Sequence, residues 1–222
     1  MLVNKLVKTK ELFDCSNEYL KDLFDTNEYP WEILPKIKDY IKILIEKGIP
    51  GYTKLSDDVL VGENVKIYEN TTIEGPTIIG SGTEIRPGAF IRGSVITGEN
   101  CVIGNSTELK NSILLDKVQV PHYNYVGDSI LGNHSHMGAG SICSNLKSDG
   151  KNIVIHGEID YPTNLRKIGG ILADFADIGC GCVLNPGTII GKSTSVYPLT
   201  SLRGVYPSNS IVKSTKEIVE RR

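Results

Sequence analysis

The chain has 222 residues, of which 40% are hydrophobic and 23% charged, the balance of an ordinary folded domain rather than a disordered one. A formal net charge of −2 excludes a general attraction to nucleic acid or to an anionic membrane surface, so any anionic substrate must be held by local basic residues. No run of about 18 apolar residues offers a membrane span and no secretory signal opens the chain. Five cysteines without framework spacing then favour a reducing cytoplasm.

Residues 1–54 are expected to be helical. The stretch 31–47 places aliphatic side chains on one stripe, and Gly48 and Pro50 follow it as breakers. Pro35 fits only in the first turn of that helix. We expect this segment to cap the open end of the repeats that follow, because their terminal strands would otherwise be unpaired. Partner binding or substrate gating is the alternative role.

From Val61 the chain repeats every six residues. Aliphatic residues dominate one row at this spacing: Val61, Ile67, Ile73, Ile79, Ile85, Ile91, Thr97, Ile103, Leu109 and Leu115. Small or β-branched residues, among them Cys101, stand four positions after each. Near the end the same phase returns, in Leu172, Ile178, Leu184, Ile190, Val196 and Leu202, with Cys182 in the companion row.

A period of six matches neither a helix nor an alternating strand, but it does match a solenoid in which three hexads close one triangular coil. The aliphatic row points inward and the coils stack about 4.8 Å apart by parallel pairing. The predicted fold class is therefore an all-β solenoid, a left-handed parallel β-helix of hexapeptide repeats over residues 55–207, with helical caps at both ends.

The repeat is interrupted once and then ends. Val120, Val126, Leu131 and Met137 continue the wall with a single five-residue step. Residues 144–170 break the pattern and read as a long loop, a feature that is often functional. Residues 208–222 are expected to form a C-terminal helix.

Polar residues that break the repeat concentrate between positions 108 and 145. Three of the four histidines lie there: His122, His134 and His136. A histidine suits proton transfer near neutral pH because its unperturbed pKa is about 6.5. For His122 taken alone, a solvated or structural role competes with a catalytic one.

Several segments of this stretch carry a family resemblance: ELK at 108–110, PHYNYVGD at 121–128 with the pattern H-x-x-Y-x-G-D, MGAG at 137–140, and Asn145. They resemble the acetyltransferase half of the bifunctional N-acetylglucosamine-1-phosphate uridyltransferase/glucosamine-1-phosphate acetyltransferase. The spacing agrees without gaps from Arg92 to Asn145, and the likeness resumes loosely from Ile178 to Tyr206. The segment YPWEILPKIKDY also resembles a stand-alone family of such proteins, often labelled uridyltransferases.

Uridyltransferase chemistry is not expected of this sequence. It needs a glycine-rich phosphate loop on an α/β domain of about 200 residues. Only about 60 residues precede the repeats, and no such loop is among them.

The resemblance implies a transferase that uses acetyl-CoA as co-substrate and acts on a small anionic amino sugar. By position, His122 is the general base and Glu108 orients the acceptor. The substrate-binding candidates are Arg92, Lys110, Tyr125 and Asn124, with Arg92 and Lys110 at phosphate-binding positions. The cofactor-binding candidates are Ala139, Asn145 and Cys180.

The resemblance also implies a homotrimer, since the family builds its sites between the subunits of a trimer. Two catalytic candidates depart from the family pattern: His136 stands in place of an asparagine, and Cys180 in place of the serine that steadies the oxyanion. A thiol is a weaker donor than a hydroxyl. Leu146 and Lys147 replace an aromatic and acidic pair.

Two alternatives from other classes stay open. One is a non-catalytic module that binds a sugar nucleotide or sugar phosphate and forms trimers. The other is a zinc enzyme like the γ-class carbonic anhydrases, which use the same solenoid. His134 and His136 lie two apart on an expected strand, so they would share a face and could bind metal with His122. The paired histidines of that class sit five apart, however, so no metal is expected.

Overall fold

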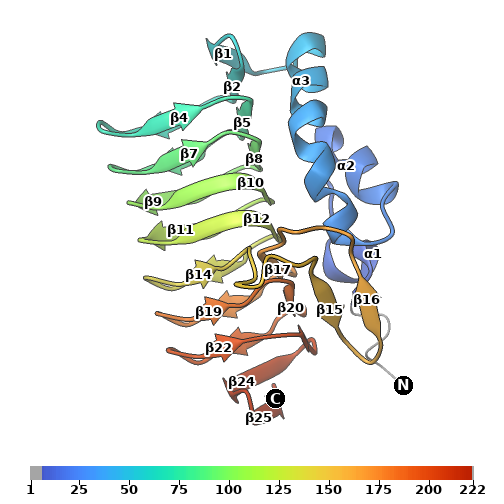
Figure 1. The fold of residues 1–222 in the computed structure, drawn as a ribbon. Helices are drawn as coiled ribbons and strands as arrows, with labels where there is room; N and C mark the ends of the chain where they lie inside the picture. Colours follow the sequence, from blue (N-terminus) through green and yellow to red (C-terminus); the bar gives the residue numbers. More distant parts are fainter. Residues whose placement is uncertain (1–6, 222) are drawn as a thin grey trace.

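The computed structural model describes residues 7–221 and contains a short helical segment followed by a stack of triangular β-coils (Figure 1). The helical segment comprises α1 (Thr9–Leu12), α2 (Glu18–Asp25), the 3-10 turns η2 (Pro30–Glu32) and η3 (Leu34–Lys36), and α3 (Ile37–Lys47). The helix expected from residue 31 therefore starts at Ile37. Pro30 and Pro35 lack the N–H that an α-helix needs in its interior, so the preceding residues form two 3-10 turns instead. None of these described helices is long and apolar enough to cross a membrane.

The predicted left-handed parallel β-helix is confirmed, and its strands form three walls. The first wall contains β2 (Val59–Val61), β5 (Thr77–Ile79), β8 (Val95–Thr97), the second halves of β10 (Glu108–Leu114) and β12 (Tyr125–Leu131), β17 (Gly170–Leu172), β20 (Thr188–Ile190) and β23 (Val205–Tyr206). The second wall contains β3 (Lys66–Ile67), β6 (Glu84–Ile85), β9 (Val102–Asn105), β11 (Gln119–His122), β13 (His136–Met137), β18 (Asp177–Ile178), β21 (Ser195–Val196) and β24 (Ser210–Ser214). The third wall contains β4 (Thr72–Glu74), β7 (Phe90–Arg92), the first halves of β10 and β12, β14 (Ile142–Cys143), β19 (Val183–Leu184) and β22 (Ser201–Leu202).

The register of the first wall shows where the repeat slips. Val59 pairs with Thr77 and Thr77 pairs with Val95, so these coils are eighteen residues long. Val95 pairs with Ser112 and Ser112 with Ser129, which makes the next two coils seventeen residues long. The chain thus takes two five-residue steps, whereas the sequence predicts one.

The inner core follows the aliphatic row of the hexads. Side chains such as Ile79, Ile103 and Leu184 are completely buried in it. Leu115, expected inside, instead contacts the helical segment, and Leu114 takes the inward place. The reason is that a five-residue step separates Leu109 from the next inward residue, so that residue is Leu114, one position earlier than a six-residue step would place it.

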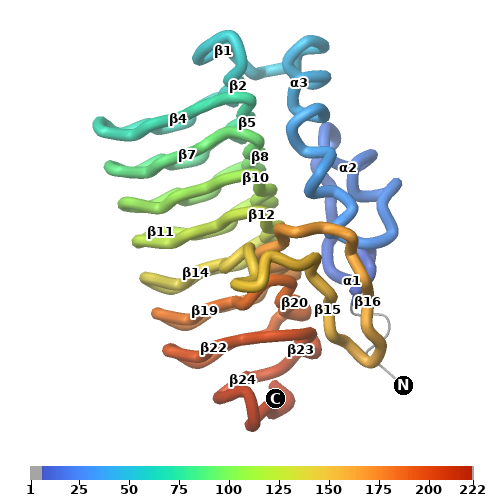
Figure 2. Tube along the Cα trace, in the orientation of Figure 1, coloured from blue at the N-terminus to red at the C-terminus, as the bar shows by residue number. Residues whose placement is uncertain are grey.

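The N-terminal segment lies against the side of the first wall, with α3 beside β8 and β10, and does not close the end of the solenoid (Figure 2). This corrects the expected cap. The insertion at residues 144–170 lies beside the lower part of the same wall, at β20. The outward row of that wall is aliphatic and must be covered: Leu60, Ile78, Ile96, Ile113, Ile130, Ile171 and Ile189. Burial of each such side chain contributes about 1.5–3 kcal/mol. The end of the stack is instead covered by β1 (Thr53–Ser56), which pairs antiparallel with β2.

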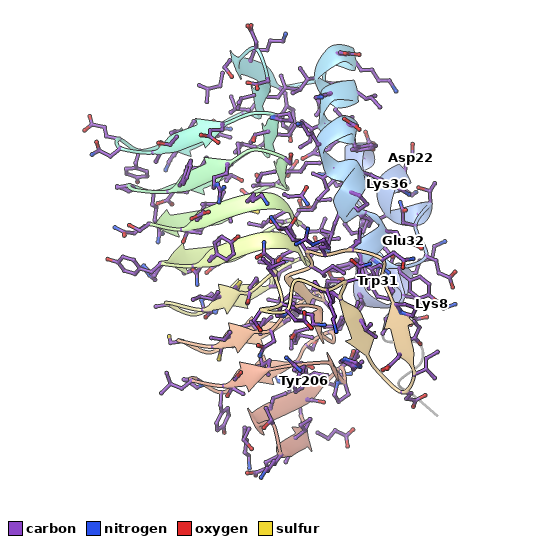
Figure 3. The ribbon with its side chains drawn as sticks, in the orientation of Figure 1. Lys8, Asp22, Trp31, Glu32, Lys36 and Tyr206 are labelled. Carbon is purple, nitrogen blue, oxygen red and sulfur yellow. The ribbon has the colours of Figure 1, made fainter. Side chains whose placement is uncertain are left out.

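The interruption at residues 144–170, expected to be a loop, contains a β-hairpin. Its strands β15 (Val154–His156) and β16 (Asp160–Pro162) pair antiparallel. Ile155 is buried in the same outer core as the helical segment. The ring centroid of Tyr161 lies 6.0 Å from that of Trp31, which Figure 3 labels where the helical segment meets the insertion. The insertion is therefore packed against the N-terminal segment.

The predicted C-terminal helix at residues 208–222 is wrong. Residues 210–220 form an antiparallel hairpin of β24 and β25 (Glu217–Glu220), in which Ile211 pairs with Val219. β24 also pairs with β21 of the preceding coil. A short polar segment is only marginally stable as an isolated helix, whereas the open edge of that coil offers hydrogen-bond partners to a strand. The β-branched residues of the segment also suit a strand.

Candidate functional site

The outward face of the third wall brings together four residues predicted to bind or orient the substrate. Glu108 pairs with Phe90 on one side and with Tyr125 on the other. Arg92 and Lys110 each stand two positions further along their strands. Their side chains lie on one surface because residues i and i+2 of a strand share a face.

The charges on this wall are paired. Arg92 Nη1 lies 2.6 Å from Glu108 Oε1, and the hydrogen bond and negative charge of Glu108 raise the pKa of Arg92. Lys110 Nζ lies 3.7 Å from Asp128 Oδ2. The wall therefore offers two cations whose own counterions are close by, so an incoming anion would compete with Glu108 for Arg92.

Asp128 is not among the site residues predicted from the sequence, yet its carboxylate contacts two of them, Lys110 and Asn145. It is 6% exposed, and its carboxylate accepts hydrogen bonds from Asn145 Nδ2 at 2.5 Å and from Asn111 Nδ2 at 2.9 Å. Asn145 Nδ2 also lies 3.2 Å from the Tyr125 hydroxyl. The available signal was its position as the last residue of the H-x-x-Y-x-G-D segment.

The glycine of that segment makes room for the tyrosine. A Cβ on Gly127 would lie 2.5 Å from the Tyr125 hydroxyl and 2.9 Å from Asn145 Nδ2, so the ring can lie along the wall only over glycine. Burial raises the pKa of Tyr125, and the charges of Asp128 and Glu108 add to the effect. The hydroxyl therefore stays protonated at neutral pH and can donate a hydrogen bond.

The corner between the second and third walls carries His122, Ala139 and Cys180 in one row. Gly140 N–H donates to the carbonyl of His122 at 3.0 Å, and Gly181 N–H donates to the carbonyl of Ala139 at 2.8 Å. The three residues thus occupy equivalent positions on successive coils, and all three are exposed. One base candidate and two cofactor-binding candidates are brought together here.

Asn124, expected to bind substrate, belongs to the interior of that corner. It is 2% exposed. Its Oδ1 accepts from the backbone N–H of His122, and its Nδ2 donates to the carbonyls of Gly138 and Ser141. Since both ends of the amide are engaged by backbone, its observed role is to hold the corner that carries His122.

His136 lies on the second wall and is not brought together with Glu108 or Tyr125 within one chain. Its Nδ1 is 2.8 Å from Asp177 Oδ1 of the next coil, and this hydrogen bond lowers the pKa of Asp177. His134 is at a corner, where its ring stacks on Phe175 at 4.8 Å. The expectation that His134 and His136 share a face is therefore wrong, because the strand begins only after residue 135. Within residues 7–221 no three His, Cys, Asp or Glu side chains are grouped to hold a metal ion.

Known proteins show what this chain is similar to. A family described as the GMPPB C-terminal domain matches residues 73–161. The bifunctional protein GlmU of Methanococcus maripaludis is 34% identical over 87% of this chain and 47% of its own length. A bifunctional sugar-1-phosphate nucleotidylyltransferase/acetyltransferase of Sulfurisphaera tokodaii is 31% identical over 76% of this chain and 43% of its own.

Among solved structures, an N-acyltransferase from Bacillus cereus bound to dTDP and coenzyme A is 15% identical, with a TM-score of 0.43 over 79% of this chain and 92% of that one. The chain spans about half the length of the curated relatives it matches. Over most of its own length, the chain resembles the acetyltransferase half of the bifunctional protein GlmU.

Proposed function

We propose that the protein is a CoA-dependent acyltransferase that moves an acetyl group from acetyl-CoA to the amine of an amino-sugar phosphate. The observation that carries the proposal is the exposed row of His122, Ala139 and Cys180 at the edge of a wall that bears Arg92 and Lys110. A base, an exposed row along which the acyl donor can lie, and cations for an anionic acceptor then border one surface. The acetyltransferase named among the relatives supports the same reaction class.

His122 is proposed as the general base. An amine attacks a thioester only in its neutral form, so a base must take up its proton near neutral pH. The nitrogen then bonds to the acetyl carbon, the carbon–sulfur bond breaks, and the CoA sulfur leaves with a proton. Cys180 is proposed to donate to the oxyanion, more weakly than a hydroxyl would.

The other residues are proposed to position the two substrates. Arg92 and Lys110 hold the phosphate, and Tyr125 donates to the sugar from its hydroxyl. Glu108, on the same wall, orients the amine. Ala139 lies along the path of the acyl donor, at the edge of the wall that carries His122. Asn145, expected on the same path, lies at the opposite edge, where its Nδ2 contacts Asp128 and the Tyr125 hydroxyl.

The site is proposed to be completed in a cytoplasmic homotrimer. In a trimer with prisms side by side, the second wall of one subunit can face the third wall of its neighbour. His136 would then reach a neighbour's substrate, which a single chain does not permit. Light scattering that gives the mass of one chain would remove this part of the proposal.

The first test is His122→Ala, with His134→Ala as the matched control, since both histidines are exposed at corners. Loss of general-base catalysis should reduce turnover of an amino-sugar phosphate by about 10²–10⁴-fold. The control should retain turnover, and calorimetric binding of acetyl-CoA should persist in both variants. Turnover unchanged in His122→Ala would remove His122 from the mechanism.

A non-catalytic binding module is the second candidate. It is favoured by the close pair of Arg92 and Glu108, which leaves the expected acceptor-orienting carboxylate bound to a cation at 2.6 Å. Failure of the wild-type protein to bind acetyl-CoA at millimolar concentration, together with binding of a sugar phosphate, would select this candidate.

A further inference from the structure

A pocket of about 510 Å³ lies beyond the proposed acceptor wall, at the corner between the third and first walls. Its size falls in the range of about 300–1,000 Å³ typical of small-molecule sites. Asn111 and Asp128 of that corner form one side. The opposite side comes from the insertion and the helical segment, so three parts of the chain that are distant in sequence meet here.

The pocket combines apolar walls with two cations. Leu34 and Pro35 contribute from the helical segment, and Leu146 and Leu165 from the two ends of the insertion. The neighbouring Arg166 and Lys167 add the positive charges.

The insertion is fixed where it enters the pocket. Leu146 and Lys167 form a β-bridge, Ile168 N–H donates to the carbonyl of Asn145 at 3.1 Å, and Gly169 N–H donates to that of Asp128 at 2.7 Å. Arg166 Nε donates to the carbonyl of Gly150 at 3.2 Å. Arg166 and Lys167 therefore belong to a segment whose backbone is fixed to the coils by hydrogen bonds.

The charge of the pocket is net positive. The only carboxylate among its lining residues is Asp128, and that carboxylate is already engaged by Lys110, Asn111 and Asn145. Arg166 and Lys167 thus remain available to an anion. A guanidinium can also stack on a planar ring, which a point charge cannot do.

The pocket continues directly from the acceptor wall. Lys110, proposed to hold the phosphate of the acceptor, has its ammonium 3.7 Å from the Asp128 carboxylate that lines the pocket. The row of His122, Ala139 and Cys180 lies at the opposite edge of the same wall. A group attached beyond the acceptor's phosphate would therefore enter this pocket, whereas the acyl donor belongs at the other edge.

We propose that this pocket receives the nucleoside diphosphate part of a nucleotide-linked amino sugar, so that the acceptor is larger than a simple sugar phosphate. This inference rests on the proposed function for the identity of the acceptor. The second phosphate meets Arg166 and Lys167, and the nucleoside lies between the aliphatic walls.

The test is calorimetric titration of the full chain with UDP and with GDP, without acyl donor. At least one should bind at about one site per chain. Arg166→Ala/Lys167→Ala should weaken that binding at least tenfold. Leu146→Trp, which narrows the pocket at a half-exposed position without removing charge, should weaken it as well. Lys151→Ala, an exposed cation of the same insertion outside the pocket, should bind as the wild type does.

Three outcomes would overturn the proposal. One is the absence of UDP and GDP binding at 5 mM by protein that binds acetyl-CoA. Another is nucleotide binding that both pocket variants leave intact. The third is binding of adenosine 3′,5′-bisphosphate, the nucleotide end of CoA, with the same dependence on Arg166 and Lys167.

The experiments distinguish a failure of the pocket proposal from a failure of the acyltransferase proposal. Nucleotide binding through Arg166 and Lys167 without any His122-dependent turnover would uphold the pocket and remove the acyltransferase. Turnover of a sugar 1-phosphate by protein that binds neither nucleotide would uphold the acyltransferase and remove the pocket.

Discussion

The five cysteines differ in environment, and the hexad phase explains most of the difference. Cys101, Cys143 and Cys182 are buried inside the coils, whereas Cys180 is exposed at the corner row. Burial raises the pKa of Cys101 to about 12 and that of Cys143 to about 11. These two thiols stay neutral in the folded state well above the pH at which an unfolded chain ionises them.

The expected consequence is a loss of stability at alkaline pH. The folded-state pKa values are raised, so the unfolded state loses its thiol protons first, from about pH 9. The free energy of unfolding then falls until about pH 11 through Cys143 and until about pH 12 through Cys101. Each thiol contributes a slope of about 1.4 kcal/mol per pH unit inside that window. Urea unfolding at pH 8, 9 and 10 measures how the free energy of unfolding falls with pH. The Cys101→Ala variant should show a smaller slope than the wild type. An identical slope in this variant would contradict the assignment.

At the residue scale, much of the candidate site could be predicted. Glu108, Lys110 and Tyr125 are expected from the family resemblance, and they point outward from one wall because each stands next to an inward residue of the hexads, Leu109 or Val126. Asn124 could not be placed in the same way. It stands at a corner, where burial depends on backbone groups of the next coil that the sequence does not locate.

At the scale of the elements, the coils require close approach of backbone to backbone at their corners. Gly104 in β9 shows this most severely, since a Cβ there would lie 1.6 Å from the carbonyl oxygen of Pro121. Pro121 immediately precedes His122. The spacing of the coils at the candidate base therefore depends on a residue without a side chain.

Gly104→Ala is expected to cost about 3 kcal/mol or more in free energy of unfolding, because backbone must move to admit the methyl group. Gly157→Ala is the matched control in the insertion hairpin, where the nearest atom would be 3.5 Å away. That change should stay within about 0.5 kcal/mol. Urea denaturation followed by circular dichroism compares the two, and equal costs would refute the steric argument.

The elements that the sequence mispredicted share a physical reason. Residues 208–222 and the hairpin within 144–170 are short segments without a strong period of their own. Their conformation is decided by an available strand edge or an apolar surface, as in the pairing of β24 with β21. Such partners are absent from local sequence.

At the scale of the whole molecule, one buried carboxylate ties the N-terminal segment to the coils. Asp174 is 1% exposed and accepts from the backbone N–H groups of Asp14 and Asn133, each at 2.8 Å. Lys192 Nζ lies 3.3 Å from it. The group thus joins the entry to α2 with coils on both sides of the insertion.

Asp174→Ala is expected to destabilise the fold by about 3–5 kcal/mol, because it leaves two backbone N–H donors without their acceptor and removes one of the two carboxylates that pair with Lys192. Asp174→Asn, which keeps one acceptor oxygen, should cost less. Asp177→Ala, at an exposed carboxylate, should cost under about 1 kcal/mol. Thermal and urea unfolding of the three variants measure these changes in the free energy of unfolding. Similar changes for Asp174→Ala and Asp177→Ala would argue against the network.

The six-residue period predicts the solenoid and its inward row, because that period leaves few ways to bury the aliphatic side chains. The family resemblance adds the site residues of the third wall: Arg92, Glu108, Lys110 and Tyr125. Tertiary structure alone decided where the helical segment and the insertion pack, and hence the pocket that Arg166 and Lys167 share with Asp128. Those contacts join residues far apart in the chain. Their geometry depends on which apolar surface each segment covers, and a local pattern does not contain that choice.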